Sequence, residues 1–183
     1  NLGIIKSSNL CAEIIQYTDD KEIAVCNLGS ICLPMFVEEG KFNFDRLQQI
    51  TRILVRNLDK IIDMNYYPVP ETEYSNKKHR PMGIGIQGLS DVYKKFKFPF
   101  ESQEARNLNK LIFENIYFAC ISESVELAKK YGKYETFDNS PFSQGKPQWA
   151  LWGLSKENLS LDWSNLLNEM VLYGTRNSLL TAL

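Results

Sequence analysis

The stretch Arg80-Pro81-Met82-Gly83-Ile84-Gly85-Ile86-Gln87-Gly88 decides the fold class of this chain. Its aliphatic residues alternate with glycines, which predicts a short strand, and residues 89–95 after it predict a helix. Short apolar strands that alternate with helices are typical of α/β proteins. The sequence on both sides of this stretch favours the same class.

Two long helices are predicted, one on each side of this strand. From Phe44 to Met64, apolar residues recur at the spacing of one helical face. A second helix is predicted from Ser102, its N-cap, to Lys130, and Gly132 ends it. The residues expected on the two buried faces are Leu47, Ile50, Leu54, Leu58, Ile61 and Ile62 in the first helix, and Leu108, Leu111, Ile112, Ile116 and Ala119 in the second.

Shorter elements fill the rest of the chain, and no internal repeat or low-complexity tract interrupts them. Apolar runs predict strands, polar residues with proline and glycine predict loops, and a period of 3.6 residues predicts helices. The predicted elements are an extended segment at 13–17, a buried strand at Ile23–Cys26, a short helical stretch from Thr72, a loop at 138–152, a helix at Trp163–Leu172 and a strand at Ser178–Leu183.

Composition limits the classes of function. The 183 residues are 44% hydrophobic, which is enough for one domain-sized core. A formal net charge of -1 gives no electrostatic excess for binding nucleic acid or an anionic membrane. No apolar run approaches the roughly 20 residues that span a bilayer, and no signal-peptide pattern opens the chain. We therefore expect a cytoplasmic protein without a nucleic-acid or membrane partner.

The four cysteines match neither a metal-binding pattern nor the disulfide framework of a small secreted protein. They are Cys11, Cys26, Cys32 and Cys120, irregularly spaced, with His79 as the single histidine. Without a Cys-x-x-Cys pair or a clustered ligand set, no metal site is expected on this chain. Because the chain starts at Asn1 without a methionine and stops in an apolar stretch, we interpret it as an internal piece of a longer polypeptide.

Asn9-Leu10-Cys11-Ala12-Glu13 places an amide, a thiol and a carboxylate at alternate positions. In an extended segment, all three side chains project to the same side. A thiyl radical formed from the thiol could take a hydrogen atom from carbon, the carboxylate could accept a hydroxyl proton, and the amide could orient hydroxyl groups. Taken singly, each has an ordinary alternative: a quiet cysteine, a surface carboxylate and a turn residue.

Four sequence blocks together resemble the catalytic large subunit of class I ribonucleotide reductase. They lie in the order of that family and span nearly the whole chain. The blocks are Ser8-Asn9-Leu10-Cys11-Ala12-Glu13-Ile14, Ala24-Val25-Cys26-Asn27-Leu28, Arg80-Pro81-Met82-Gly83-Ile84-Gly85-Ile86-Gln87-Gly88-Leu89 and Arg176-Asn177-Ser178-Leu179.

The resemblance implies a role for each residue of the candidate site. Cys11 would be the transient thiyl radical that abstracts the 3'-hydrogen of the ribose, Glu13 the base on the 3'-hydroxyl, and Asn9 a hydrogen-bonding partner of the substrate. Cys26 would be one of two thiols that reduce the 2'-carbon and become a disulfide, with its partner cysteine upstream of this chain. The activity implied is reduction of ribonucleoside diphosphates to deoxyribonucleotides, for which this piece alone would be inactive.

The resemblance also implies the surroundings of the chain. The fold would be part of a ten-stranded α/β barrel, with residues 1–17 as finger loop and following strand and 18–183 as much of the second half-barrel. The radical would come from a metal-containing small subunit, reducing equivalents from thioredoxin or glutaredoxin, and ATP and dNTP effectors would bind outside this segment. No cofactor is expected on this chain, and the full-length subunit would form a homodimer.

Two other classes of function remain open on sequence alone. Gly83, Gly85 and Gly88 form a literal G-x-G-x-x-G, the pattern of a dinucleotide-binding oxidoreductase, although charged residues stand where the preceding strand should be. A non-catalytic helical interaction module would make the cysteines incidental. We expect structural roles for Cys32 and Cys120, and core or interface packing for Tyr66-Tyr67 and for Trp149, Trp152 and Trp163.

Overall fold

The computed structural model describes residues 3–6, 8 and 15–181. Strands β1 (Leu28–Cys32) and β4 (Gly83–Gln87) pair in parallel, in a register from Leu28 opposite Gly83 to Cys32 opposite Gln87. Parallel bridges join residues 178–181 to the other side of β4, where the Ile84 amide donates to the Leu180 carbonyl at 3.1 Å. In the described residues, the chain pairs in parallel on both sides of β4: with β1 in a regular ladder, and with residues 178–181 through isolated bridges. Residues 178–181 are called the third strand.

The strand predicted at Ile23–Cys26 is wrong, because β1 begins only at Leu28. The Gly83 amide donates to the Asn27 carbonyl, so the next bond of a parallel ladder would run from residue 81 to the Val25 carbonyl. Residue 81 is a proline and has no amide hydrogen, so the ladder stops. Residues 15–17 of the predicted extended segment likewise form no strand.

Helices α1 (Phe44–Met64) and α4 (Gln103–Tyr131) have the predicted bounds within one residue. The Asn43 side chain accepts from the Arg46 amide at the start of α1, and Ser102 accepts from the Ala105 amide at the start of α4. Ile50 and Ile61 were predicted to be buried but are 40% and 46% exposed. The buried stripe of α1 runs instead through Leu47, Thr51, Val55, Leu58, Asp59 and Ile62.

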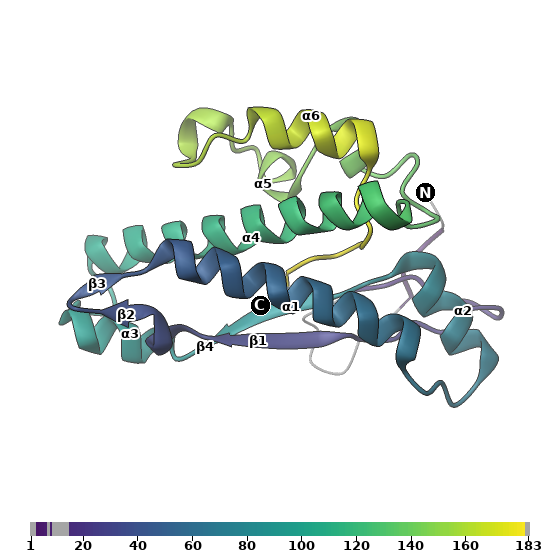
Figure 1. Cartoon of the computed structure of the whole chain (residues 1–183), viewed down its shortest axis with the longest axis horizontal. Coiled ribbons are helices and arrows are strands. Elements are labelled where there is room, and N and C mark those ends of the chain that lie inside the picture. Colours follow the sequence, from purple (N-terminus) through teal and green to yellow (C-terminus); the bar gives the residue numbers. More distant parts are fainter. Residues whose placement is uncertain (1–2, 7, 9–14, 182–183) are drawn as a thin grey trace.

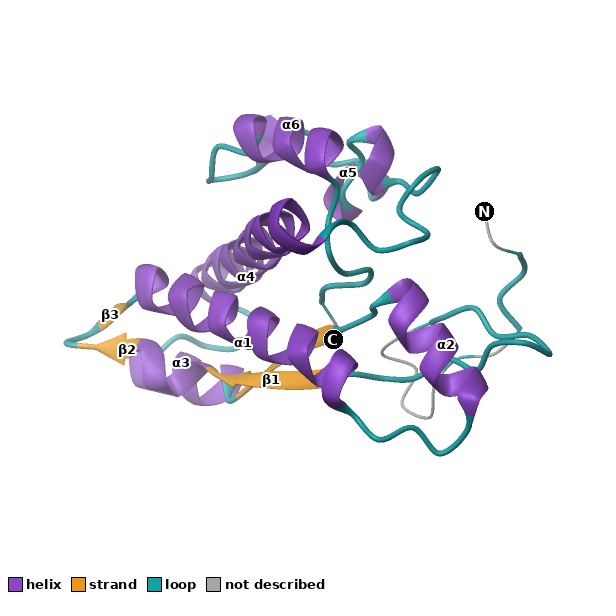
Figure 2. Cartoon of the chain, turned by 45° about the vertical axis from the view of Figure 1, so that its right-hand side comes forward, coloured by secondary structure: helices purple, strands orange, loops and turns teal. Residues whose placement is uncertain are grey.

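The elements stack in layers. Helix α1 packs against both β1 and α4, and α4 packs in turn against α6 (Ser164–Tyr173) (Figures 1 and 2). Figure 1 shows that α1 begins at the end of the molecule where β1 finishes, so that β1 starts beside the later turns of α1. The core lies between these layers, with Trp163 1% exposed and Ile112 fully buried.

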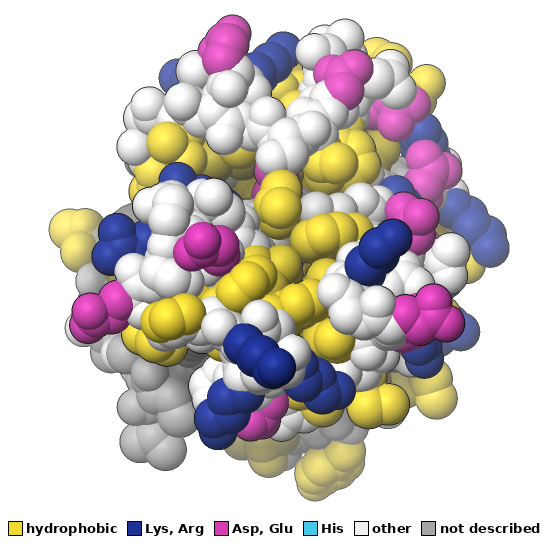
Figure 3. Space-filling model, turned by 90° about the vertical axis from the view of Figure 1, so that its left-hand side faces the viewer, with side chains coloured by type: hydrophobic (Ala, Val, Ile, Leu, Met, Phe, Trp, Pro, Cys, Tyr) yellow, Lys and Arg dark blue, Asp and Glu magenta, His cyan; other side chains and the backbone are white. Residues whose placement is uncertain are grey.

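The remaining elements are short. Helices α2 (Pro70–His79) and α3 (Leu89–Phe96) confirm the helical stretches predicted around β4. Figure 3 views the end of the molecule at which β2, β3 and α3 lie, where hydrophobic side chains gather across the middle of the face. The others are β2 (Val37–Glu38), β3 (Lys41–Phe42), α5 (Gln148–Leu151) and the 3-10 turns Leu33–Phe36, Phe142–Gln144 and Lys156–Asn158.

The architecture confirms the α/β class but contains no closed barrel. The three parallel strands form an open sheet within residues 3–6, 8 and 15–181. None of the described helices is long and apolar enough to cross a membrane.

Candidate active site

The edge of the sheet at which its parallel strands begin brings together parts of the second, third and fourth sequence blocks. Cys26 precedes β1, Pro81 precedes β4, and Ser178 opens the third strand. Cys26 is exposed at this edge. Asn9, Cys11 and Glu13 lie outside the described residues, so their predicted arrangement stays a prediction.

Gln16 connects the chain after Glu13 to the segment that carries Cys26. Its side-chain amide donates to the Val25 carbonyl at 3.0 Å. That carbonyl is the ladder acceptor that Pro81 leaves without a backbone donor. The bond therefore connects the segment at residues 15–17 to the residue immediately before Cys26.

A cleft of about 430 Å³ opens at the same edge. Gly3 and Ile5 line it from before the Asn9–Glu13 segment, and residues 15–17 line it from after that segment. Its other walls come from α2, the loop between α4 and α5, and the third strand. The residues on these walls are His79, Tyr134, Thr136, Asp138, Asn139, Ser140, Pro141, Ser178 and Leu179.

A buried chain of hydrogen bonds fixes one wall of this cleft. Glu22, 3% exposed, lies 2.6 Å from His79 Nε2 through its Oε2 atom, and His79 Nδ1 lies 2.8 Å from the hydroxyl of Thr136. Lys78 donates to the other Glu22 oxygen at 3.2 Å. Burial is the largest single effect on Lys78 and opposes its charge, but the hydrogen bonds to and charges of Glu22 and Tyr74 together outweigh it and raise the lysine pKa. Sequence reasoning missed this group, because a lone histidine gives no sign of its partners.

A second buried polar group, behind the strands, holds them to α1. Arg80 donates through Nε and Nη2 to Asp59 Oδ1, at 3.0 and 2.8 Å, and through Nη1 to Asp63 Oδ1 at 2.7 Å. Asn177 donates to the same oxygen of Asp59 at 2.8 Å and accepts from the Ser124 hydroxyl at 3.0 Å. The third and fourth sequence blocks thus meet on one carboxylate of α1.

Neither Cys32 nor Cys120 is placed to be the redox partner of Cys26. Cys32 lies at the far end of β1, six residues along an extended chain, or about 20 Å away, whereas a disulfide needs Cα atoms about 6 Å apart. Cys120 is fully buried in α4, and this burial raises the pKa of its thiol well above the usual value. The expected structural role of Cys120 is confirmed.

The aromatic predictions hold only in part. Trp149 and Trp163 are 8% and 1% exposed and pack edge to face, but Trp152 is 68% exposed. Tyr66 is 84% exposed and does not pack as predicted, since it follows the last turn of α1 on the outside. Tyr67 instead donates its hydroxyl proton to the Ile62 carbonyl at 2.6 Å.

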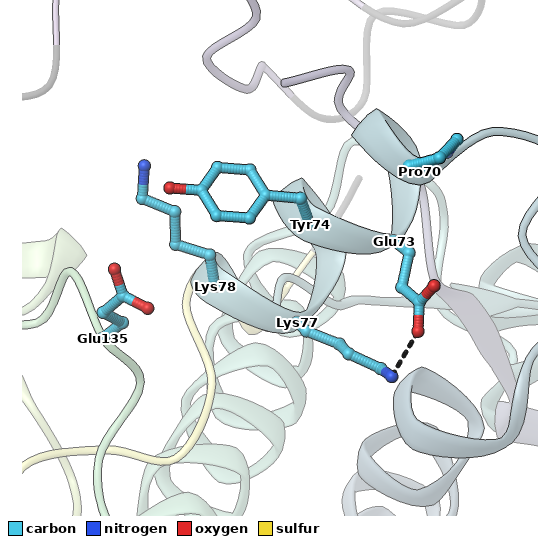
Figure 4. Close-up of a pocket in the computed structure, with 6 residues that line it drawn as sticks. All are labelled: Pro70, Glu73, Tyr74, Lys77, Lys78 and Glu135. Carbon is cyan, nitrogen blue, oxygen red and sulfur yellow. Dashed lines mark hydrogen bonds and ion pairs between the residues drawn. The ribbon is translucent and has the colours of Figure 1, made fainter. Parts of the chain in front are cut away.

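The second pocket lies on the outer side of α2 and has paired charges. Figure 4 shows Lys77 beside Glu73, to which it donates, and Lys78 next to Tyr74, whose ring centroid is 5.0 Å from the ammonium nitrogen. Because both lysines are engaged within the chain, we assign no ligand to this pocket.

The glycine pattern does not form a dinucleotide-binding turn. Gly83 and Gly85 lie inside β4, paired with β1, whereas the fingerprint needs its glycines in the turn after a strand. Only Gly88 has left-handed backbone angles, with φ of 78°, and a Cβ there would lie 2.6 Å from Cδ of Pro34. Close packing of α3 on the Pro34 turn explains this glycine.

Comparison with known proteins defines the family. The family model described as "Ribonucleotide reductase, barrel domain" matches residues 1–183, and the chain belongs to this family. The chain is 53% identical over 182 residues to the "Ribonucleoside-diphosphate reductase large subunit" of Variola virus and 52% identical over 184 residues to that of Plasmodium falciparum. It is 52% identical over 188 residues to the "Ribonucleoside-diphosphate reductase large chain 2" of Saccharomyces cerevisiae. All of the chain is covered in each case, but it spans only 22% to 24% of the length of these relatives.

Proposed function

We propose that this chain is the part of a ribonucleoside-diphosphate reductase large subunit that supplies the radical cysteine and one redox thiol. The observation that carries the proposal is the hydrogen bond from Gln16 to the Val25 carbonyl. Gln16 is only five positions after Cys11 along the chain, so the covalent backbone keeps their Cα atoms within about 18 Å. The segments that carry the two cysteines are therefore joined through Gln16, which lines the cleft.

The first half of the reaction would use the Asn9-Cys11-Glu13 triplet. A thiyl radical on Cys11 takes the 3'-hydrogen atom of the ribose, which restores the thiol and leaves a carbon radical. Glu13 accepts the proton of the 3'-hydroxyl, and Asn9 holds the hydroxyl groups by hydrogen bonds. The alternation of these residues supports the assignment, because it would turn all three to one side of an extended segment.

Cys26 would supply half of the reducing power. Replacement of the 2'-hydroxyl by hydrogen, with release of water, consumes two electrons and two protons, which two thiols release when they become a disulfide. The exposure of Cys26 at the strand edge supports this role, since the thiol must meet both a substrate and a second cysteine. That second cysteine would come from the longer polypeptide, and thioredoxin or glutaredoxin would reduce the disulfide.

The whole enzyme extends well beyond this chain. Residues 1–17 would form the finger loop and following segment, and 18–183 would form much of the second half of a ten-stranded barrel. The three parallel strands support this placement, because their open edges can accept further strands. A metal-bearing small subunit would generate the radical, ATP and dNTP effectors would bind elsewhere, the large subunit would form a homodimer, and the assembly would be cytoplasmic.

The Cys26→Ser variant of the full-length enzyme tests this function. With the small subunit and reductant present, we expect substrate to be consumed while deoxynucleotide formation falls to background, because serine cannot form the disulfide. The measurement is deoxynucleotide formed and ribonucleotide consumed over the same interval. Repeated turnover of the variant at the parent rate would rule out the redox role.

A further inference from the structure

Asn27, the residue directly after Cys26, has a buried and fully engaged side-chain amide. It is 5% exposed, and its Nδ2 donates to Asn76 Oδ1 at 2.6 Å and to the Pro81 carbonyl at 2.8 Å. Its Oδ1 accepts from Asn76 Nδ2 at 3.3 Å. Both amide hydrogens and the amide oxygen of Asn27 are thus used.

Asn76 anchors this pair to the helices. It is fully buried in α2 and also donates to the Tyr67 hydroxyl, which donates in turn to the Ile62 carbonyl near the end of α1. The amide pair therefore connects the residue beside Cys26 to two helices at once. Such a chain of satisfied buried hydrogen bonds is rigid, because breaking any one of them leaves a buried polar group without a partner, which costs free energy.

The last ladder bond runs from the Gly83 amide to the Asn27 carbonyl, so the side-chain amide of Asn27 is the next contact toward Cys26 on this side. Regular pairing starts at Leu28, and Pro81 cannot donate the next ladder bond. On both sides of Cys26, side-chain amides make hydrogen bonds where the backbone ladder has ended. The Gln16 amide donates to the Val25 carbonyl, and the Asn27 amide donates to the Pro81 carbonyl. Of these two hydrogen bonds, the one from Asn27 is buried and the one from Gln16 is partly exposed.

We infer that Asn27, braced by Asn76, is a positioning residue that holds the Cys26 thiol where it can reduce the substrate. The inference rests on the proposed redox role of Cys26. Because reduction depends on the alignment of thiol and substrate, a shift of the backbone at residue 27 lowers the yield of product without stopping hydrogen abstraction at Cys11. A purely structural asparagine would lower both together.

The test compares variants of the full-length enzyme with its small subunit and reductant. The readout is the ratio of deoxynucleotide formed to ribonucleotide consumed. For Asn27→Ala we expect this ratio to fall about tenfold or more, as small misplacements of reacting groups do. Asn76→Ala leaves the bond from Asn27 to Pro81 in place, so we expect a smaller fall, and this variant decides the matter if Asn27→Ala does not fold.

Asn115→Ala is the matched control. Asn115 is also 5% exposed, and its side-chain amide accepts from Gln48 at 2.7 Å and donates to the Leu111 carbonyl at 2.8 Å. It lies on α4 and contacts Gln48 near the start of α1, whereas β1 starts beside the later turns of α1 (Figure 1). We expect its loss to leave the ratio unchanged.

The outcomes separate the inference from the proposed function. If Cys26→Ser lowers the ratio to background but both asparagine variants keep the parent ratio, Asn27 has no positioning role. A fall of the same size in Asn115→Ala would also overturn the inference, since any buried amide would then have the effect. An unchanged ratio in Cys26→Ser would instead contradict the proposed function.

Discussion

At the scale of single residues, Arg80 shows how a buried charge can define a turn. Its backbone is left-handed, with φ of 44° and ψ of 52°, a conformation that costs a non-glycine residue about 1 kcal/mol. The side chain is 4% exposed and reaches Asp59, Asp63 and the Asp59 carbonyl. These bonds offset the backbone strain and fix the turn from α2 into β4.

Replacement of Arg80 should therefore be costly. In Arg80→Ala, Asp59 keeps a bond from Asn177 but loses its main cation, and we expect the free energy of local unfolding of α1 to fall by about 3 kcal/mol or more. Hydrogen exchange of the α1 amides measures this. Arg46→Ala, which removes a half-exposed pair with Glu38, is the control and should cost under about 1 kcal/mol. Equal effects of the two variants would show that the Arg80 group does not hold α1.

Sequence reasoning recognised Arg80 and Asn177 as members of blocks but not what they do. Their shared partner, Asp59, lies on a helix among Leu58, Lys60 and Ile61, where a carboxylate is ordinarily solvated. Only the fold brings residues 59, 80 and 177 together. A single sequence carries no signal for a hydrogen bond between residues 118 positions apart.

At the scale of secondary structure elements, the contact between α1 and the start of β4 depends on pH. The hydrogen bond from Arg80 lowers the pKa of Asp63 below its ordinary value of 3.8. A carboxyl group whose pKa is lower in the folded state stabilises the fold above its unfolded pKa. That contribution disappears as the pH falls through the folded pKa.

The Asp63→Asn variant tests this dependence. It should be less stable than the parent protein at neutral pH, and the difference should close below pH 3.8 as the parent carboxyl becomes protonated. Asp63 is 50% exposed, so solvent screens the pair and we expect a difference below about 1 kcal/mol. The measurement is the urea concentration at half-unfolding across the pH range. A difference that stays constant from neutral to acid pH would contradict the assignment.

Helices were predicted from sequence much better than strands. Asn43 and Ser102 cap α1 and α4 locally, and Gly132 ends α4, so the bounds of both helices depend on neighbouring residues. The start of β1 depends instead on Pro81, a residue far along the chain that cannot donate a ladder bond. The mistaken strand at Ile23–Cys26 follows from this dependence on a distant partner.

At the scale of the whole molecule, the second, third and fourth blocks of sequence meet at one edge of the sheet. Their order along the chain indicated the family, and the family model matches residues 1–183. The hydrogen bonds beside this edge, from Gln16 to Val25 and from Asn27 to Asn76, could not be read from the sequence, because each joins segments that only the fold brings together. Of the cleft wall at residues 134–141, only 138–141 fell within a predicted loop, and none of these residues had an assigned role.

The account depends most of all on Cys11 as the radical-bearing residue. The most direct measurement is deoxynucleotide formation by the full-length Cys11→Ser variant, together with its affinity for the ribonucleoside diphosphate. We predict no product above background and an affinity close to that of the parent, because a hydroxyl group cannot replace the thiyl radical. The Cys32→Ser variant, which changes an exposed thiol at the far end of β1, should keep the parent activity. Substantial product from Cys11→Ser would contradict the account.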